Sequence, residues 1–109
     1  MPDMSKLQIR AKILSVISEL KSLPVFNEEL LHHYCREFSL IDDKKAIFDI
    51  YIKEFIKLDE KDYTFSSLIL KETVDNNYIN EKTIEMLQSH SLSDECKYKL
   101  VQLLRIIGG

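Results

Sequence analysis

Apolar residues recur at steps of three and four along nearly the whole chain, which is the spacing of amphipathic α-helices. Residues that favour helix N-termini precede these apolar segments. No segment shows the sustained alternation of apolar and polar residues that is typical of a strand. The pattern therefore predicts five to six short helices. We expect them to run from Ser5 to about Lys21, from Asn27 to about Phe38, from Asp42 to about Leu58, from Asp62 or Thr64 to about Thr73, from Asn80 to about Ser89, and from Ser93 through Ile107.

Single residues also indicate where the first helix ends, how the second begins and how deeply the third is buried. Leu23 precedes Pro24, and a residue before proline disfavours the helical region, so the first helix should end there. Phe26 lies just before the second helix and Leu31 within its first turns, which is the arrangement of a hydrophobic staple. The third predicted helix is apolar on almost every face, and such a helix is buried on most sides. We therefore expect residues 43–58 to form the centre of the domain.

Residues 27–57 and 80–107 share a plan: Asn-Glu at a helix start, a Ser-Leu-x-Asp-acidic turn, and a lysine before a denser apolar helix. Each segment is interpreted as a helical hairpin, and two stacked hairpins suit a small α-helical scaffold. Asn76-Asn77 is expected to form a turn, because asparagine tolerates the left-handed conformation. We thus predict a single all-α domain over residues 1–109, a compact bundle of short helices arranged as stacked helical hairpins.

The amino-acid composition excludes several classes of function. The 109 residues carry a net charge of −3, with 45% hydrophobic and 30% charged residues, as in an ordinary globular domain. The only glycines are Gly108 and Gly109, so the glycine-dependent loops that cradle phosphate or expose a nucleophile are absent. No stretch approaches the about 18 consecutive apolar residues of a membrane span. Cys35 and Cys96 lie far apart, as free thiols of a reducing compartment would, which favours a cytoplasmic location and leaves Sec-independent delivery open.

The stretch LLHHYCREF, residues 30–38, contains two histidines and a cysteine, which are residue types that can bind a metal or act in catalysis. On a helix, His32 and His33 point to opposite flanks of the solvent side. His32 and Cys35 could share a metal, but a structural zinc site needs four ligands, and the sequence lacks a second spaced pair. We therefore expect no metal, no other cofactor and no catalytic site, and interpret the histidines as surface residues that pair with the glutamates four positions before them. The face with His32, His33 and Arg36 is a second candidate surface for a partner.

Two apolar and aromatic spots fall outside the predicted core faces, one at the start of the fourth helix and one in the turn before the fifth. Tyrosine and phenylalanine exposed beside charges are typical interface anchors, and the acidic residues around both spots favour a basic partner surface. The alternative is that these side chains cover the open end of the bundle. The candidate partner-binding residues are Tyr63, Phe65, Asp75, Tyr78 and Ile79.

A compact helical domain without pocket chemistry usually acts through its surface. We therefore expect a non-catalytic module that binds a specific protein partner, such as an enzyme or effector, with a homodimer as a second possibility. Its size and composition are similar to those of small bacterial immunity proteins, antitoxin-like inhibitors and effector regulators, which neutralise or adapt another protein. The alternative is a helix-turn-helix regulator of nucleic acid, with Lys44, Lys61 and Lys99 among its phosphate contacts. Acidic residues are interleaved with these lysines, so neither nucleic acid nor a membrane is expected as the partner.

Overall fold

The computed structural model describes residues 5–23 and 27–108. Within these residues the chain forms six α-helices and no strand, as the sequence predicts. The predicted roles of Pro24 and Phe26 lie outside the described residues. No helix in the described part combines the length and the apolar character that a membrane crossing requires. The helices are α1 (Lys6–Ser22), α2 (Glu28–Ser39), α3 (Lys44–Phe55), α4 (Glu60–Thr73), α5 (Asn76–Leu87) and α6 (Asp94–Gly108).

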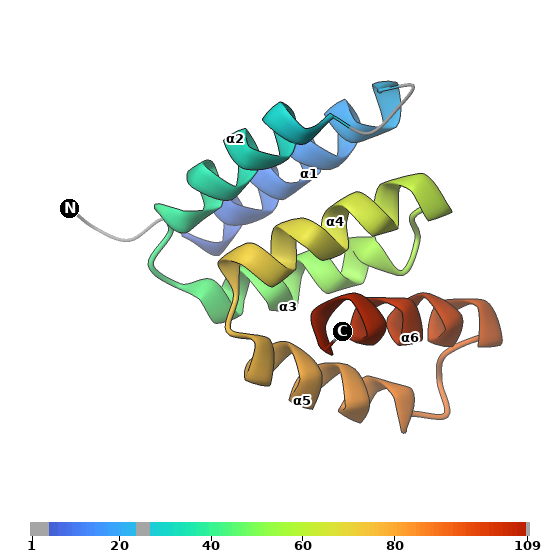
Figure 1. Ribbon diagram of the computed structural model, residues 1–109. Coiled ribbons are helices and arrows are strands. Elements are labelled where there is room, and N and C mark those ends of the chain that lie inside the picture. The colour runs from blue at the N-terminus through green and yellow to red at the C-terminus, as the bar shows by residue number, and fades with distance from the viewer. Residues whose placement is uncertain (1–4, 24–26, 109) are drawn as a thin grey trace.

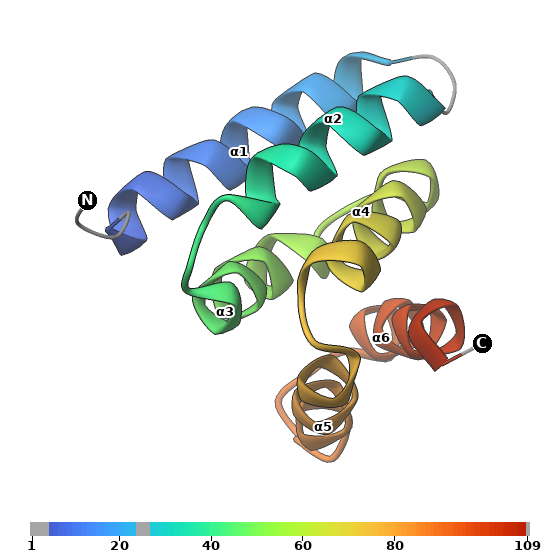
Figure 2. The ribbon, with the colours of Figure 1, turned by 60° about the vertical axis from the view of Figure 1, so that its left-hand side comes forward.

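The helices are stacked in three layers of two, α1 with α2, α3 with α4, and α5 with α6 (Figure 1 and Figure 2). Between layers, α1 packs on α3, α2 on α4, and α4 on α6. The predicted stack of helical hairpins is therefore confirmed, but its grouping is different. α5 and α6 pack as one hairpin, whereas α2 and α3 belong to different layers. The link between α2 and α3, which contains the buried Ile41, joins two layers, so residues 27–57 do not pack as a single hairpin (Figure 1).

The central helix is α4, and the expectation that residues 43–58 form the centre is wrong. α4 packs against α1, α2, α3 and α6. Its buried face contains Ser66 and Ser67, both 0% exposed, and these small side chains let neighbouring helices approach. Ser66 Oγ lies 2.6 Å from the Tyr51 hydroxyl, and Ser67 Oγ donates to the Tyr63 carbonyl at 2.7 Å. Because both hydroxyls are hydrogen-bonded, burying them costs little, and hydrophobicity alone underestimates how buried α4 is.

Several helix starts agree with the predicted N-caps. Ser5, Asn27 and Ser93 each accept a hydrogen bond from a backbone N–H of the following first turn. The third helix begins one residue later than predicted, because Asp43 and not Asp42 caps it. These caps satisfy backbone donors that have no partner inside the helix.

The starts of α4 and α5 differ from the prediction. α4 begins at Glu60, before the expected cap, and α5 begins at Asn76 rather than after Asn80. Asp75 caps α5 by accepting a hydrogen bond from Asn77 N at 3.3 Å. The expected turn is thus the first turn of a helix. Asparagine and aspartate favour both turns and helix N-termini, so residue type does not distinguish the two.

Lysine ammonium groups close the C-terminal ends of three helices. Lys44 donates to the last carbonyls of α2. Lys61 on α4 donates to the Leu20 carbonyl of α1 at 3.1 Å, and Lys99 on α6 donates to the Ile56 carbonyl at the end of α3 at 3.0 Å. Helices often end on a glycine in the left-handed conformation. Here no described residue, Gly108 included, has a positive φ. Cationic side chains satisfy the terminal carbonyls instead and oppose the negative end of the helix dipole.

Candidate functional site

Most of the predicted aromatic and apolar anchors are core residues. Tyr63, Phe65 and Ile79 are 5%, 4% and 0% exposed, so the expectation that they stand out from the surface is wrong. The Tyr63 ring packs edge-on against Phe55 with 5.9 Å between centroids. The Phe65 ring packs in the same way against Tyr34 at 6.2 Å. These contacts join different helices, and the periodicity of one helix does not reveal them.

The predicted surface is also divided in two by α4. Tyr63 and Phe65 lie in its first half, whereas Asp75 and Tyr78 follow its end. The 14 residues of α4 span about 21 Å at 1.5 Å per residue. Tyr78 is partly buried and donates a hydrogen bond to Asp49 of α3 at 2.8 Å, while Asp75 caps α5. Asp75 and Tyr78 therefore hold α5 in place and do not form one surface with Tyr63.

The second predicted surface lies on the exposed side of α2. His32, His33 and Arg36 are all exposed, as expected. His32 Nε2 is 3.7 Å from the Glu28 carboxylate, which confirms one predicted pair. His33 pairs instead with Glu37, which follows it by one turn, at 3.6 Å. Exposed pairs of this kind contribute little to stability, and the three residues form a solvated helix face.

Cys35 lacks the environment of an activated nucleophile. Both Cys35 and Cys96 are free thiols. Burial raises the pKa of the Cys35 thiol, and the charge of Glu72 adds to the effect, so the reactive thiolate is disfavoured. Across residues 5–23 and 27–108, no three His, Cys, Asp or Glu side chains gather closely enough to hold a metal ion.

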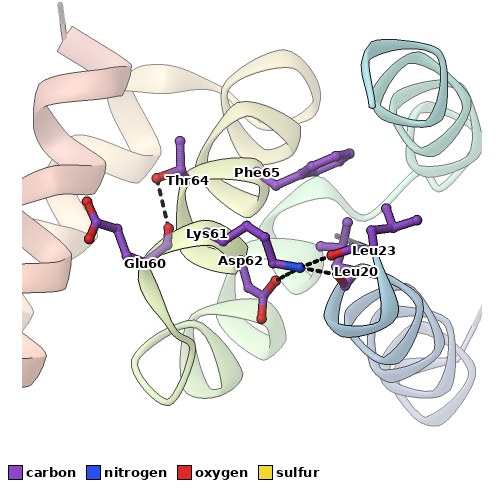
Figure 3. A pocket seen from close by; sticks show the side chains of 7 residues that line it. All are labelled: Leu20, Leu23, Glu60, Lys61, Asp62, Thr64 and Phe65. Atoms are coloured by element: carbon purple, nitrogen blue, oxygen red, sulfur yellow. Dashed lines mark hydrogen bonds and ion pairs between the residues drawn. The ribbon is translucent and has the colours of Figure 1, made fainter. Parts of the chain in front are cut away.

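A pocket of about 280 Å³ opens between the C-terminal end of α1 and the first turns of α4 (Figure 3). We call it the α1–α4 pocket. One side is apolar and the other carries charged and hydroxyl groups. Phe65, which was expected to be an exposed anchor, forms part of the apolar wall. The lining residues are Leu20, Leu23, Glu60, Lys61, Asp62, Thr64 and Phe65.

Lys61 lies across the polar side of this pocket. Its ammonium donates to the carbonyls of Leu20 and Leu23, and it is 3.5 Å from Asp62 Oδ1 (Figure 3). The Asp62 side chain is 4% exposed. Its Oδ1 is buried and accepts no hydrogen bond from any residue that the structure describes. A buried carboxylate oxygen held only by a loose ion pair is energetically costly, which marks Asp62 as a candidate binding residue.

Tyr98 extends the surface from α4 to α6. Its side chain is 57% exposed, and α4 and α6 pack against each other. Burial raises the pKa of Tyr63, and Glu60 and Tyr98 raise it further, so Tyr98 lies beside the first turn of α4. Val101, one turn further along α6, is also exposed. The α1–α4 pocket and Tyr98 therefore lie near the first turn of α4, the pocket on its α1 side (Figure 3) and Tyr98 on its α6 side.

Sequence reasoning missed Leu23, Lys61 and Tyr98 as site residues. They belong to separate segments of the chain, and only the stacking of the layers brings them together. One local signal was available at Asp62. If α4 is extended back to Glu60, Asp62 falls four residues before buried Ser66 on the core-facing side, where an acidic residue is unusual.

Several of the basic residues that were candidate phosphate contacts have partners within the chain. Lys44, Lys61 and Lys99 all donate to backbone carbonyls, and Lys57 lies 3.8 Å from Glu54. None of these contacts favours the helix-turn-helix alternative. Comparison with protein-family models, curated proteins and solved structures finds no match to this chain.

Proposed function

We propose that this chain is a non-catalytic protein-interaction module that binds one specific partner protein and inhibits or adapts it. The observation that carries the proposal is the α1–α4 pocket, with the exposed Tyr98 on the α6 side of the same helix α4 (Figure 2). Interface hot spots are typically tyrosines and pockets that receive a side chain of the partner. The pocket volume of about 280 Å³ leaves room for a side chain of the partner.

The charge near the pocket favours a basic partner surface. Asp59 and Glu60 are exposed at the start of α4, and Asp62 lies behind them. The whole chain has a net charge of −3. Complementary charge accelerates association and selects against wrong partners, whereas buried contacts supply most of the affinity.

A substitution that closes the pocket tests the proposal. Thr64 is exposed on α4 and lines the pocket, so Thr64→Arg should fill the opening and add a positive charge without disturbing the core. Ser15→Arg is the matched control, because it adds the same side chain to the exposed face of α1. A partner is captured from native cells with the wild-type protein, identified by mass spectrometry, purified, and titrated by calorimetry against each variant.

We expect Thr64→Arg to weaken binding by about 2 kcal/mol or more, as for a blocked hot spot. Ser15→Arg should stay within about 0.5 kcal/mol of wild type. Tyr98→Ala should also weaken binding, while the circular dichroism spectrum and melting temperature of all three variants remain close to wild type. A partner that binds Thr64→Arg normally would refute this surface, and the face with His32, His33 and Arg36 would become the next candidate.

A further inference from the structure

We propose that the α1–α4 pocket binds the guanidinium group of an arginine side chain on the partner, an inference that rests on the proposed function. Three oxygen acceptors converge on Lys61 Nζ. Two are the carbonyls of Leu20 and Leu23, and the third is Asp62 Oδ1 (Figure 3). The two carbonyls belong to the C-terminal end of α1, where the helix dipole is negative. The polar side of the pocket is therefore a cation site, and the chain occupies it with its own ammonium.

Lys61 fills this site incompletely. The 3.5 Å between Lys61 Nζ and Asp62 Oδ1 allows an ion pair but is too long for a good hydrogen bond. Asp62 Oδ1 accepts no hydrogen bond from the described residues. The Lys61 side chain is 43% exposed, so it can turn into water with little loss of packing. An ammonium offers three donors, whereas a guanidinium offers five in a rigid plane and can reach both carbonyls and the carboxylate together.

The apolar side of the pocket suits the stem of an arginine. Leu20, Leu23 and Phe65 form its apolar wall, and arginine methylenes pack on such surfaces while the charged head is hydrogen-bonded. Glu60 adds a second negative charge to the lining. A lysine from the partner would repeat the contacts that Lys61 already makes. Arginine adds the missing donor to Asp62, and the chemistry therefore favours arginine.

Chemical rescue of a variant that lacks the internal cation tests the inference. Lys61→Ala leaves the three acceptors in place and removes their donor. Ethylguanidinium and its uncharged analogue ethylurea are each added at millimolar concentration, and the melting temperature is followed by circular dichroism. We expect ethylguanidinium to raise the melting temperature saturably, by about 5 °C once it exceeds its Kd tenfold, and ethylurea to have no such effect. The double variant Lys61→Ala/Asp62→Asn should lose the response.

Lys44→Ala is the matched control for rescue. This substitution also removes a lysine that donates to the last carbonyls of a helix. That helix is α2, and its end lies outside the α1–α4 pocket. Equal rescue of Lys44→Ala and Lys61→Ala, or rescue by ethylurea, would reveal a general effect of the additives and overturn the inference. Folded Lys61→Ala that shows no rescue would overturn it as well.

The wild-type chain provides the test if Lys61→Ala does not fold. The probes are acetyl-Leu-Arg-Leu-amide and the same peptide with citrulline, which has the shape of arginine but no charge. We expect the arginine peptide to shift the methyl resonances of Leu20 and Leu23 at concentrations where the citrulline peptide does not. Equal shifts from both peptides, shifts confined to other helices, or no shifts would overturn the inference.

The experiments can refute either of the two proposals without refuting the other. Rescue by ethylguanidinium, combined with normal partner binding by Thr64→Arg, would refute the proposed surface and leave the guanidinium site standing. Loss of partner binding in Thr64→Arg without any rescue or peptide shift would refute only the choice of arginine.

Discussion

Lys99 Nζ donates a hydrogen bond to the Ile56 carbonyl over 3.0 Å, so a residue of α6 closes the end of α3. The Lys99 side chain is 11% exposed, and the bond is therefore largely withdrawn from water. Glu95, the other partner of Lys99 at 3.7 Å, is 81% exposed, and such a pair contributes little. One charged hydrogen bond thus connects the third layer of the stack to the second.

Lys99→Met should destabilise the fold by about 1.5–3 kcal/mol. Methionine keeps most of the side-chain volume but leaves the Ile56 carbonyl without its charged donor, which is the usual cost of losing such a bond. Urea unfolding followed by circular dichroism measures the change. Arg105→Met, at an exposed position of the same helix, should change stability by less than about 0.5 kcal/mol. Equal losses in both variants would contradict a specific role for the Lys99 bond.

Tyr51→Phe should destabilise the domain by about 1–3 kcal/mol, because it leaves the buried Ser66 hydroxyl without its partner 2.6 Å away. Ser66→Ala alone should have a similar effect, because it leaves the buried Tyr51 hydroxyl without its partner. The double variant should be closer to wild type than the sum of the single variants, because no buried hydroxyl is left unpaired. Chemical unfolding of all four proteins measures this coupling, and strictly additive losses would show that the hydroxyls do not depend on each other.

Stability should fall as the pH rises from about 10 to about 12, in part through Tyr78. Burial, followed by the hydrogen bond to Asp49 and nearby acidic charges, raises the pKa of Tyr78 to about 12. An unfolded tyrosine has a pKa of about 10, so the folded state holds the proton over this interval while the unfolded state releases it. Stability from this group is therefore fully present below pH 10 and is lost above it. Tyr78→Phe should flatten this decline in urea unfolding.

The control for the alkaline experiment is Ser15→Ala, which changes an exposed residue that carries no titratable group. Its stability should decline with pH as in wild type. Burial also raises the pKa values of Tyr34 and Tyr51, so some alkaline decline should remain in Tyr78→Phe. An unchanged pH slope in Tyr78→Phe would contradict the predicted role of this residue.

The helices were predictable from the sequence because their signals are local. Apolar residues of α1 at helical spacing are buried at five positions, and the N-caps at Ser5, Asn27 and Ser93 follow from side-chain chemistry within one turn. The list of buried α1 residues is Ile9, Ile13, Val16, Ile17 and Leu20. The predicted helix starts were wrong where one residue type favours both turns and helix N-termini, as at Asn76.

The layers and the pocket were not predictable in the same way. Counting apolar residues favoured α3 as the centre, whereas α4 reaches that place through buried serines whose hydroxyls are satisfied. The α1–α4 pocket depends on residues separated by about forty positions. Lys61 contacts Leu20 only because α4 is laid across the end of α1, and no spacing rule within a segment contains that relationship.

The lysine closures run in one direction along the stack. Lys61 of the second layer closes α1 of the first, and Lys99 of the third closes α3 of the second, so the cation always belongs to the later layer. When either end layer detaches, both the ammonium and the carbonyl of its closure become exposed to water. Each of these lysines therefore couples the layer that carries it to the layer before it, as nearest neighbours in a one-dimensional array.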